Sequence, residues 1–197
     1  RASLFRKGAS SPSGRRHSRT GWSLDMSQTP SNIILIGMPG AGKSTIGPVL
    51  SEKTSREFLD TDAVIQAVQK RNLQDIVNTD GQAAFRRVEE EVILSLALQN
   101  HVIATGGSTV YSEQAIRHLR SDGITVFLDA DLATLEARIH NFNSRGLVKR
   151  PDQTFAQLFA ERLPLYRKYA DITVNSTGLT PEEVCAEIFT ELGRVTG

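Results

Sequence analysis

The stretch Gly37–Thr45 has the residue types and the spacing that bind phosphate groups. It reads G-M-P-G-A-G-K-S-T, follows the apolar run Ile33–Ile36, and matches the pattern G-x-x-x-x-G-K-[ST]. Glycines let successive backbone N–H groups point inward, the following helix start adds partial positive charge, and lysine and serine suit the terminal phosphates and Mg²⁺. We predict a loop that binds ATP through Gly37, Pro39, Gly40, Ala41, Gly42, Lys43, Ser44 and Thr45.

Two carboxylates separated by a single residue follow this loop along the chain. Asp60 closes the strand-like run Glu57–Asp60, and Asp62 comes two residues later. In a parallel sheet the carboxyl end of such a strand faces the same crevice as the phosphate loop. We expect Asp60 and Ser44 to hold Mg²⁺ and Asp62 to hydrogen-bond the hydroxyl group that receives the phosphoryl group. The alternative is a solvated turn in which Asp62 caps a helix over Ala63–Lys70, and both roles can hold together.

Three further features indicate an acceptor that is an anion. Arg86 lies in a long helical segment, Gly106 and Gly107 follow a strand-like run, and Arg162 opens the sequence R-L-P-L-Y. The planar fork of a guanidinium can form two parallel hydrogen bonds to a carboxylate, and glycines expose backbone N–H groups to a ligand. Each feature taken alone is also compatible with a surface arginine or a tight turn.

The elements that must position these residues alternate short β-rich runs with helical segments. The strand-like runs are Asn32–Gly37, Glu57–Asp60, Val102–Thr105, Thr125–Asp129 and Asp171–Val174. This alternation is typical of an α/β fold with a parallel sheet and helices on both faces. The segment Gly81–Gln99 predicts an amphipathic helix, and between Asn141 and Gln153 the periodicity lapses into a basic loop.

The length and composition predict one ordinary globular domain. The chain has 197 residues, of which 39% are hydrophobic and 23% charged. It contains no apolar run approaching the ~20 residues that a membrane helix needs. Its one cysteine, Cys185, excludes an internal disulfide framework and a cysteine-based zinc site, and we expect this residue to be a small apolar residue of the last helix. We expect a cytoplasmic monomer without a membrane partner.

The charge is distributed unevenly along the chain. Residues 1–26 carry six basic groups and one acid, a net charge of +5, whereas the remainder has 17 basic and 21 acidic groups, a net charge of −4. This balance argues against a folded domain that grips nucleic acid. We expect residues 1–30 to be a disordered basic segment before a domain over residues 31–197. An organelle transit peptide and a basic arm remain alternatives to a non-native extension before Met26, which we favour because the segment lacks an amphipathic stripe.

In combination, these motifs resemble those of the shikimate kinase family. The order and spacing match from about Asn32 to about Leu192 through the phosphate loop, D-T-D at 60–62, F-R-R at 85–87, G-G at 106–107 and R-L-P-L-Y at 162–166. The resemblance implies a three-layer α/β/α P-loop kinase fold like that of the nucleoside monophosphate kinases. Its five-stranded parallel sheet would have the order 2-3-1-4-5, with a mobile lid. The implied reaction is phosphorylation of the 3-hydroxyl of shikimate by ATP.

The resemblance also implies a role for each matching residue. The residues implied to bind the acceptor are Asp62, Arg86, Gly106, Gly107 and Arg162, with the arginines on its carboxylate. Lys43, Ser44 and Asp60 would serve ATP and Mg²⁺, and Arg138 would pack against adenine. Arg145 would close over the γ-phosphate as the lid arginine. The alternatives there are a solvated basic loop, or Lys149 or Arg150 as the closing charge.

Two positions depart from the family pattern. The lid sequence reads Arg145-Gly146-Leu147-Val148 where the family has Arg-Pro-Leu-Leu, and Ser108 stands at the family's third glycine. Glycine makes a lid more flexible, and serine adds bulk and a hydroxyl beside the acceptor. Another small hydroxy acid, such as homoserine, therefore remains an alternative acceptor. A non-catalytic nucleotide-binding regulatory module is the alternative from another functional class.

Overall fold

The computed structural model describes residues 30–139, 149–150 and 152–196. The expected N-terminal segment therefore lies outside the described residues, as do Arg145 and Gly146 of the expected lid. The strands are β1 (Asn32–Ile36), β2 (Glu57–Asp60), β3 (His101–Ala104), β4 (Gly123–Asp129) and β5 (Ile172–Asn175). The helices are α1 (Lys43–Thr54), α2 (Thr61–Gln69), α3 (Leu73–Ser95), α4 (Glu113–Arg120), α5 (Leu132–Arg138), α6 (Phe155–Tyr169) and α7 (Pro181–Thr196), and η1 (Thr109–Tyr111) is a 3₁₀ turn.

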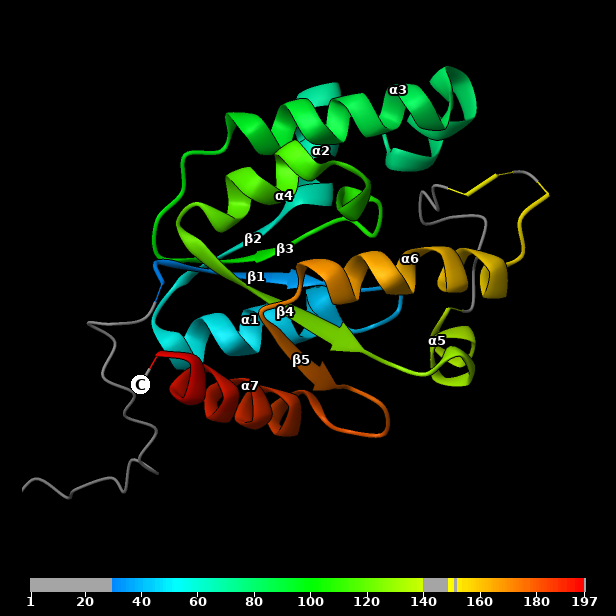
Figure 1. The fold of residues 1–197 in the computed structure, drawn as a ribbon. Helices are drawn as coiled ribbons and strands as arrows, with labels where there is room; N and C mark the ends of the chain where they lie inside the picture. Colours follow the sequence, from blue (N-terminus) through cyan, green and yellow to red (C-terminus); the bar gives the residue numbers. More distant parts are fainter. Residues whose placement is uncertain (1–29, 140–148, 151, 197) are drawn as a thin grey trace, which may run out of the picture.

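The five strands form one parallel sheet in the order β2-β3-β1-β4-β5 (Figure 1). This confirms the expected parallel sheet and its order. The observed strand ends fall within two residues of the predicted ones. β4 begins two residues early because Asn32 of β1 already pairs with Gly123.

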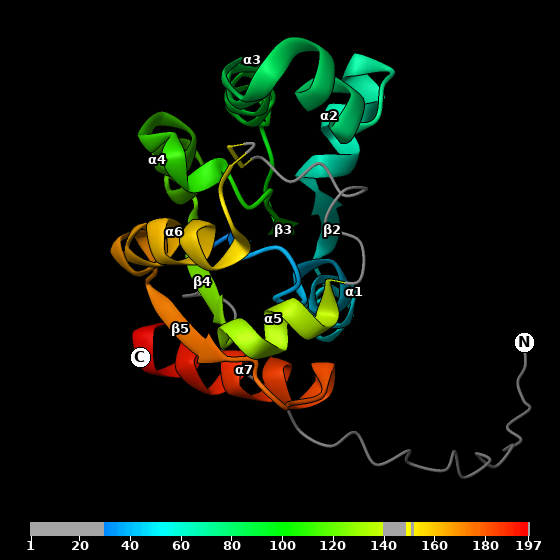
Figure 2. The same ribbon diagram turned by 90° about the vertical axis from the view of Figure 1, so that its right-hand side faces the viewer.

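The central strand β1 is buried along its whole length, because helices cover both faces of the sheet. In Figures 1 and 2, α1 and α7 lie on one face and α4 and α6 on the other, giving the expected three layers. The apolar residues of the strands and of these helices form the main core. A second apolar cluster, built around Ile65, Ile76 and Phe85, joins α2 to α3 beyond the β2 edge. This cluster fixes the elements that carry Asp62 and Arg86.

The helix predicted over Gly81–Gln99 is confirmed at its start, where a second helix follows Gly81, and is wrong at its end. The chain is already helical from Leu73, and Gly81 interrupts the helix with φ 82° and ψ 167°, so α3 is two helices joined at a kink. The helix ends at Ser95, and Leu96 is extended. Leu98 instead packs against the main core, and its carbonyl accepts a hydrogen bond from Asn32 Nδ2 at 2.7 Å. Tertiary packing of this segment therefore overrides the helical spacing of its apolar residues.

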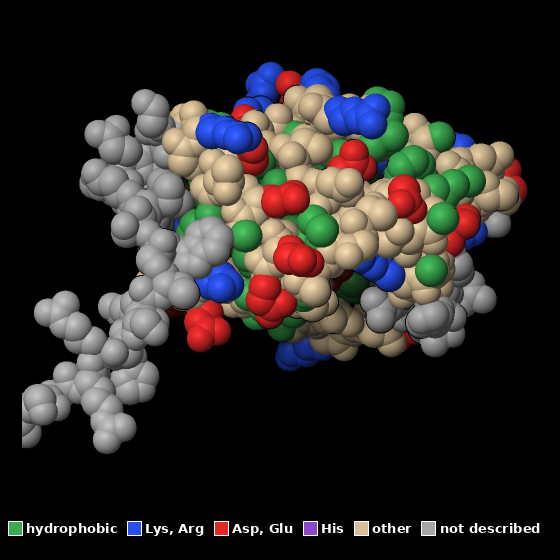
Figure 3. All heavy atoms as spheres, turned by 90° about the horizontal axis from the view of Figure 1, so that it is seen from below, with side chains coloured by type: hydrophobic (Ala, Val, Ile, Leu, Met, Phe, Trp, Pro, Cys, Tyr) green, Lys and Arg blue, Asp and Glu red, His purple; other side chains and the backbone are tan. Residues whose placement is uncertain are grey.

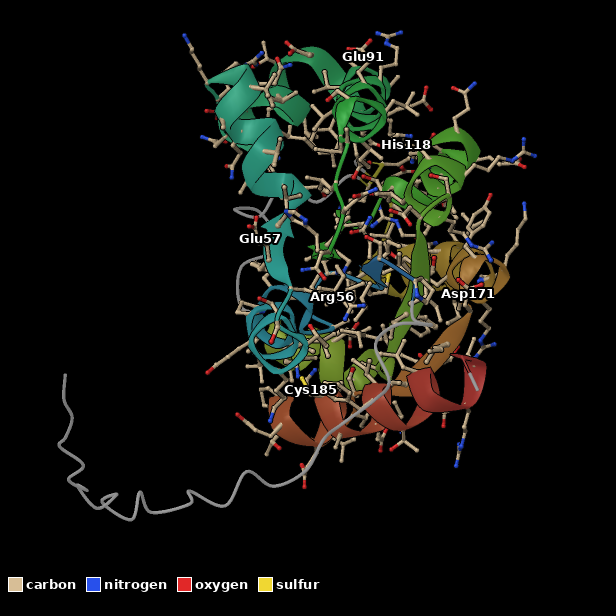
Figure 4. The ribbon with its side chains drawn as sticks, turned by 90° about the vertical axis from the view of Figure 1, so that its left-hand side faces the viewer. Arg56, Glu57, Glu91, His118, Asp171 and Cys185 are labelled. Atoms are coloured by element: carbon tan, nitrogen blue, oxygen red, sulfur yellow. The ribbon has the colours of Figure 1, made fainter. Side chains whose placement is uncertain are left out.

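The amino end of the sheet is closed by structural contacts, and Figure 4 looks onto this end. Arg56 donates from Nε and Nη2 to the carbonyl oxygens of Ser31 and Pro30 at 2.9 and 3.0 Å. His118 Nε2 donates to the carbonyl of Leu96 at 2.7 Å. Cys185 is buried in α7, as predicted for a small apolar residue. Arg56 and His118, both labelled in Figure 4, are therefore engaged in holding the fold.

Acidic and basic side chains are interspersed on the face of the molecule seen from below (Figure 3). This mixture follows the near balance of charges in the sequence. Within the described ranges, no helix is both long enough and apolar enough to cross a membrane.

Candidate active site

A cavity of about 440 Å³ opens at the carboxyl ends of the strands, the edge that Figure 2 views. Parallel strands present their ligand crevice at this edge. The cavity brings together most of the predicted site residues, namely Pro39, Gly40, Ala41, Gly42, Lys43, Ser44, Thr45, Asp62, Gly106, Gly107, Arg138 and Arg162. The residues predicted to bind the nucleotide and those predicted to bind the acceptor thus line one cavity, although more than a hundred residues separate Lys43 from Arg162 in the sequence.

The phosphate loop has the backbone conformation that its glycines predict. Gly37, Gly40 and Gly42 have φ values of 148°, 86° and 100°, which side chains rarely allow. Gly42 is the N-cap of α1 and has no side chain that could accept a hydrogen bond from the helix. The N–H groups at the start of this 12-residue helix therefore remain available to a ligand. The helix start therefore faces the cavity as an anion-binding site.

Lys43 is buried beneath this loop with its ammonium group held in place. Its Nζ donates to the carbonyl oxygens of Gly37 at 2.7 Å and Met38 at 3.0 Å. Burial lowers the pKa of Lys43 to about 8, while the negative charges of Asp62 and Asp60 oppose this shift. The charge that would meet the phosphates is thus fixed in position before a ligand binds.

Asp60 connects β2 to both the phosphate loop and α2. Its Oδ2 accepts a hydrogen bond from Ser44 Oγ at 2.8 Å, and its Oδ1 accepts one from the backbone N–H of Asp62 at 3.0 Å. Asp60 is therefore the N-cap of α2, which begins at Thr61. The alternative prediction that Asp62 caps this helix is wrong, because the helix starts at Thr61, two residues before the predicted Ala63. The Asp62 carboxyl is left to face the cavity.

Asp62 lies in the cavity wall, where the charges of two other acids, Glu89 and Asp60, act on it. Its pKa is raised to about 7, first by burial and then by the charges of Glu89 and Asp60, while the Lys43 ammonium lowers it. The carboxyl group therefore changes its charge near neutral pH, which suits a residue that accepts a hydrogen bond from a reacting hydroxyl.

Glu89 is a site residue that the sequence reasoning missed. It is only 2% exposed, and its two carboxylate oxygens accept hydrogen bonds from Ser108 Oγ at 2.6 Å and Thr109 Oγ1 at 2.9 Å. Burial raises its pKa, whereas these hydroxyls and the charges of Arg162 and Arg86 lower it. The sequence feature that could have revealed Glu89 is its place four residues after Phe85, on the buried side of α3, where an acid is unusual.

Gly106 and Gly107 make the close approaches that their expected roles require. A Cβ atom on Gly107 would lie 2.9 Å from Arg162 Nη1 and 3.0 Å from Pro39 Cδ, so this glycine lets the phosphate loop meet α6. The backbone N–H of Gly106 donates to Thr61 Oγ1 at 3.1 Å. These contacts fix the residues that follow β3 in the wall of the cavity.

The two predicted acceptor arginines both lie near the ring of Tyr111. Arg162 is 1% exposed, lines the cavity and projects from α6. Arg86 does not line the main cavity but a neighbouring one of about 170 Å³, which also contains Glu89 and Tyr111. Its Cζ lies 3.8 Å from the centre of the Tyr111 ring. Sequence reasoning gave no role to Tyr111, because nothing in the local pattern distinguishes it from a turn residue.

Arg138 lines the cavity from the end of α5. Its guanidinium donates to the carbonyl oxygens of Gly40 at 3.4 Å and Ser176 at 3.1 Å. Arg145, predicted as the lid arginine, lies outside the described residues. Within the described ranges no group of three or more His, Cys, Asp or Glu side chains could hold a metal ion. A metal here would need ligands from the phosphates and water.

The chain matches the family model described as shikimate kinase over residues 39–193. The shikimate kinase of Thermodesulfovibrio yellowstonii is 35% identical over 168 residues, which cover 84% of this chain and 96% of that protein. The shikimate kinase of Rippkaea orientalis is 39% identical over 161 residues, 80% of this chain and 85% of that protein.

Solved structures agree with the sequence comparisons. The shikimate kinase of Acinetobacter baumannii in complex with shikimate superposes with a TM-score of 0.77 at 30% identity, covering 84% of this chain and 94% of that one. The shikimate kinase of Aquifex aeolicus gives a TM-score of 0.71 at 37% identity, with coverages of 84% and 99%. The chain belongs to the shikimate kinase family.

Proposed function

We propose that this protein transfers the γ-phosphoryl group of ATP to the 3-hydroxyl of shikimate, giving shikimate 3-phosphate. The observation that carries the proposal is the meeting of the phosphate loop, Asp62 and Arg162 around one cavity. These groups suit, in turn, a nucleotide triphosphate, an acceptor hydroxyl and an acceptor carboxylate. Family membership supports the same acceptor, since the Acinetobacter baumannii relative was solved with shikimate.

The phosphate loop would hold the nucleotide. Backbone N–H groups at the start of α1 and the Lys43 ammonium would bind the phosphates, with Lys43 at the transferring group. Arg138 would pack against adenine, which its position in the cavity wall supports.

Ser44 and Asp60 would hold Mg²⁺ together with phosphate oxygens and water. The hydroxyl and the carboxylate already lie 2.8 Å apart at the mouth of the loop, and both are hard oxygen ligands of the kind that Mg²⁺ prefers. When bound, the ion neutralises charge on the phosphates. The donor set therefore fits the metal that the family implies.

Asp62, Arg162, Arg86, Gly106 and Gly107 would bind the acceptor. Asp62 would align its hydroxyl by accepting a hydrogen bond, and little proton abstraction is needed because phosphoryl transfer passes through a loose transition state. The guanidinium groups of Arg162 and Arg86 would bind its carboxylate. Because the two glycines carry no side chains, Asp62 and Arg162 can approach the backbone at Gly106 and Gly107 closely.

Arg145 would complete the site from the lid by stabilising charge on the transferring group and excluding water. Exclusion of water matters because a kinase that admits water beside the γ-phosphate hydrolyses ATP. We also propose that residues 31–197 form the catalytic domain and that it acts as a monomer. A chain starting at Met26 should then keep full activity and elute as a monomer, and loss of activity would reject this domain boundary.

A coupled assay of ATP consumption with Mg²⁺ tests the proposal, using shikimate, homoserine and a blank without acceptor. We expect saturable turnover with shikimate only. The Ser108 hydroxyl donates to Glu89 and does not offer a new donor to the acceptor, which supports shikimate over a different hydroxy acid. Turnover with homoserine alone, or only the blank rate, would reject the proposed acceptor.

Two variants test the residue roles. Asp62→Ala and Arg162→Ala should each abolish transfer while ATP binding persists, because both lie on the acceptor side of the cavity. Lys168→Ala is the matched control, since Lys168 lies on α6 with Arg162 but outside this cavity. Intact turnover in either test variant would reject its assigned role.

A further inference from the structure

Tyr111 lies close to both arginines that the proposed function places on the acceptor carboxylate. It ends the 3₁₀ turn η1, which follows β3 and the connecting residues Gly106 and Gly107. The Cζ atom of Arg86 is 3.8 Å from the centre of its ring, and that of Arg162 is 5.3 Å from the same centre. Arg86 comes from α3 and Arg162 from α6, so one aromatic side chain contacts cations from two separate helices.

The contact with Arg86 uses the face of the guanidinium and leaves its N–H groups available. A guanidinium stacked on a ring keeps its donors in its own plane, pointing away from the ring. Arg86 Nε is buried and has no hydrogen-bond partner among the described residues. An unpaired buried donor costs free energy, so this group is suited to receive an acceptor atom from a ligand.

The Tyr111 hydroxyl orients the second arginine. It donates a hydrogen bond to Glu161 Oε1, and its oxygen accepts a long hydrogen bond of 3.4 Å from Arg162 Nε. Glu161 is in turn fixed by Gln153, whose Nε2 donates to Glu161 Oε2 at 2.7 Å. The direction of the hydroxyl proton is thereby set, and the lone pairs of the oxygen are turned toward Arg162.

We propose that Tyr111 is a positioning residue that makes the acceptor site selective for a carboxylate. Its ring holds the Arg86 guanidinium, and its hydroxyl helps to orient Arg162, so both cations are arranged before the acceptor arrives. This proposal deepens the proposed function and rests on it. Preorganised charges bind an anion without the entropic cost of ordering two long side chains at that moment.

Replacement of the ring should weaken acceptor binding selectively. In Tyr111→Leu we expect the KM for shikimate to rise about tenfold, with kcat and the KM for ATP changing less than about threefold, because cation–π contacts in desolvated sites contribute at this scale. Tyr111→Phe keeps the ring and loses only the hydroxyl, so its KM for shikimate should lie between those of the wild type and Tyr111→Leu.

The decisive readout compares shikimate with its methyl ester, which keeps the hydroxyls and lacks the negative charge. The proposal expects Tyr111→Leu to lower kcat/KM for shikimate while leaving kcat/KM for the ester nearly unchanged. A merely structural role would lower both values by the same factor, and that outcome would overturn the proposal. The matched control is Tyr169→Leu, which removes a ring 4.7 Å from Lys168 outside the main cavity and should preserve the acid-to-ester ratio.

Calorimetric binding of shikimate separates this proposal from the proposed function. Weaker binding by Tyr111→Leu than by the wild type, with thermal unfolding confirming that both are folded, supports the role of Tyr111 even if turnover fails. Equal binding by the two proteins rejects that role. A wild-type protein that binds shikimate but never phosphorylates it rejects only the proposed reaction.

Discussion

The carboxyl groups of Asp62 and Glu89 lie against the same glycine from two different helices. A Cβ atom placed on Gly106 would lie 2.8 Å from Asp62 Oδ1 and would collide with Glu89 Oε1. The two acids therefore lie close together, one facing the cavity and one buried behind it. Each raises the free energy of the other's ionised form, because like charges in a poorly solvated site repel.

The first prediction concerns the pH dependence of kcat/KM for shikimate. The Asp62 carboxyl must be ionised to accept a hydrogen bond from the acceptor hydroxyl, and its pKa is raised to about 7, so activity should rise as pH increases through that value. Lys43 must be protonated, and its pKa is lowered to about 8, so activity should fall above that value. Initial rates between pH 5.5 and 9.5 should give a narrow bell. A profile that is flat from pH 5.5 to 7.5 would contradict the assignment of Asp62.

The second prediction is that Asp62→Asn stabilises the folded protein at alkaline pH. The carboxyl has an ordinary pKa of 3.8 and a folded value of about 7, so the folded state binds the proton more tightly and loses stability as pH rises between these values. Above pH 7 the folded wild type carries an ionised Asp62 and loses the full stability that this pKa shift represents, whereas asparagine never ionises. Three pKa units correspond to at most about 4 kcal/mol, a value that already includes the attraction to Lys43, and burial of the asparagine amide offsets part of it, so we expect a gain of about 1 to 2 kcal/mol.

Urea unfolding at pH 8 and at pH 4 measures this effect. The gain should be present at pH 8 and should be largely lost at pH 4, where the Asp62 carboxyl is neutral in the folded wild type. A variant that is less stable than the wild type at pH 8 would show that the attraction of Asp62 to Lys43 outweighs burial and repulsion.

The third prediction concerns Gly106→Ala. The added methyl group would displace the carboxyl groups of both Glu89 and Asp62, so we expect kcat with shikimate to fall at least about a hundredfold, as for other catalytic groups moved by about 1 Å. The phosphate loop is formed by other residues, so affinity for ADP should change less than about threefold. Fluorescence titration with a labelled nucleotide measures that affinity. Wild-type kcat in this variant would mean that the space beside Gly106 is not used in the reaction.

Much of this site was accessible from the sequence because its chemistry lies in short local patterns. The phosphate loop needs glycines, lysine and serine at fixed spacing, and Asp60 and Asp62 follow a strand directly. Glu89 and Tyr111 were missed because their roles depend on contacts between segments. Glu89 meets Ser108 and Thr109 from another element, and Tyr111 meets an arginine from α3 and another from α6.

The fold shows the same division between local and long-range information. The strands were predicted to within two residues because alternating β-rich and helical segments have a clear period. The end of α3 was not, because Leu98 leaves the helix to reach the main core, and the helical turns before the Gly81 kink were not predicted. The cap of α2 was misplaced for a similar reason, since Asp60 and Asp62 are both good capping residues and only the backbone decides between them.

The last prediction uses Ser108, the residue at the position of the family's third glycine. Its hydroxyl donates to the buried Glu89 carboxylate at 2.6 Å and so favours the ionised form of that acid. Ser108→Ala should raise the pKa of Glu89 further, disfavour its ionised form, and thereby weaken the repulsion that raises the pKa of Asp62. The acid limb of the pH profile for shikimate should move to lower pH, while the alkaline limb set by Lys43 moves little.

Thr109→Val is the matched control for this experiment, because it removes the hydrogen bond at 2.9 Å to the other oxygen of the same carboxylate. It should move the acid limb in the same direction, and the double variant should move it further than either change alone, since both hydroxyls act on one group. A shift to higher pH would mean that Glu89 stays ionised without its hydroxyl partners. Asp62 would then be titrating beside a fully charged neighbour, and Ser108 would act on the acceptor directly instead of through Glu89.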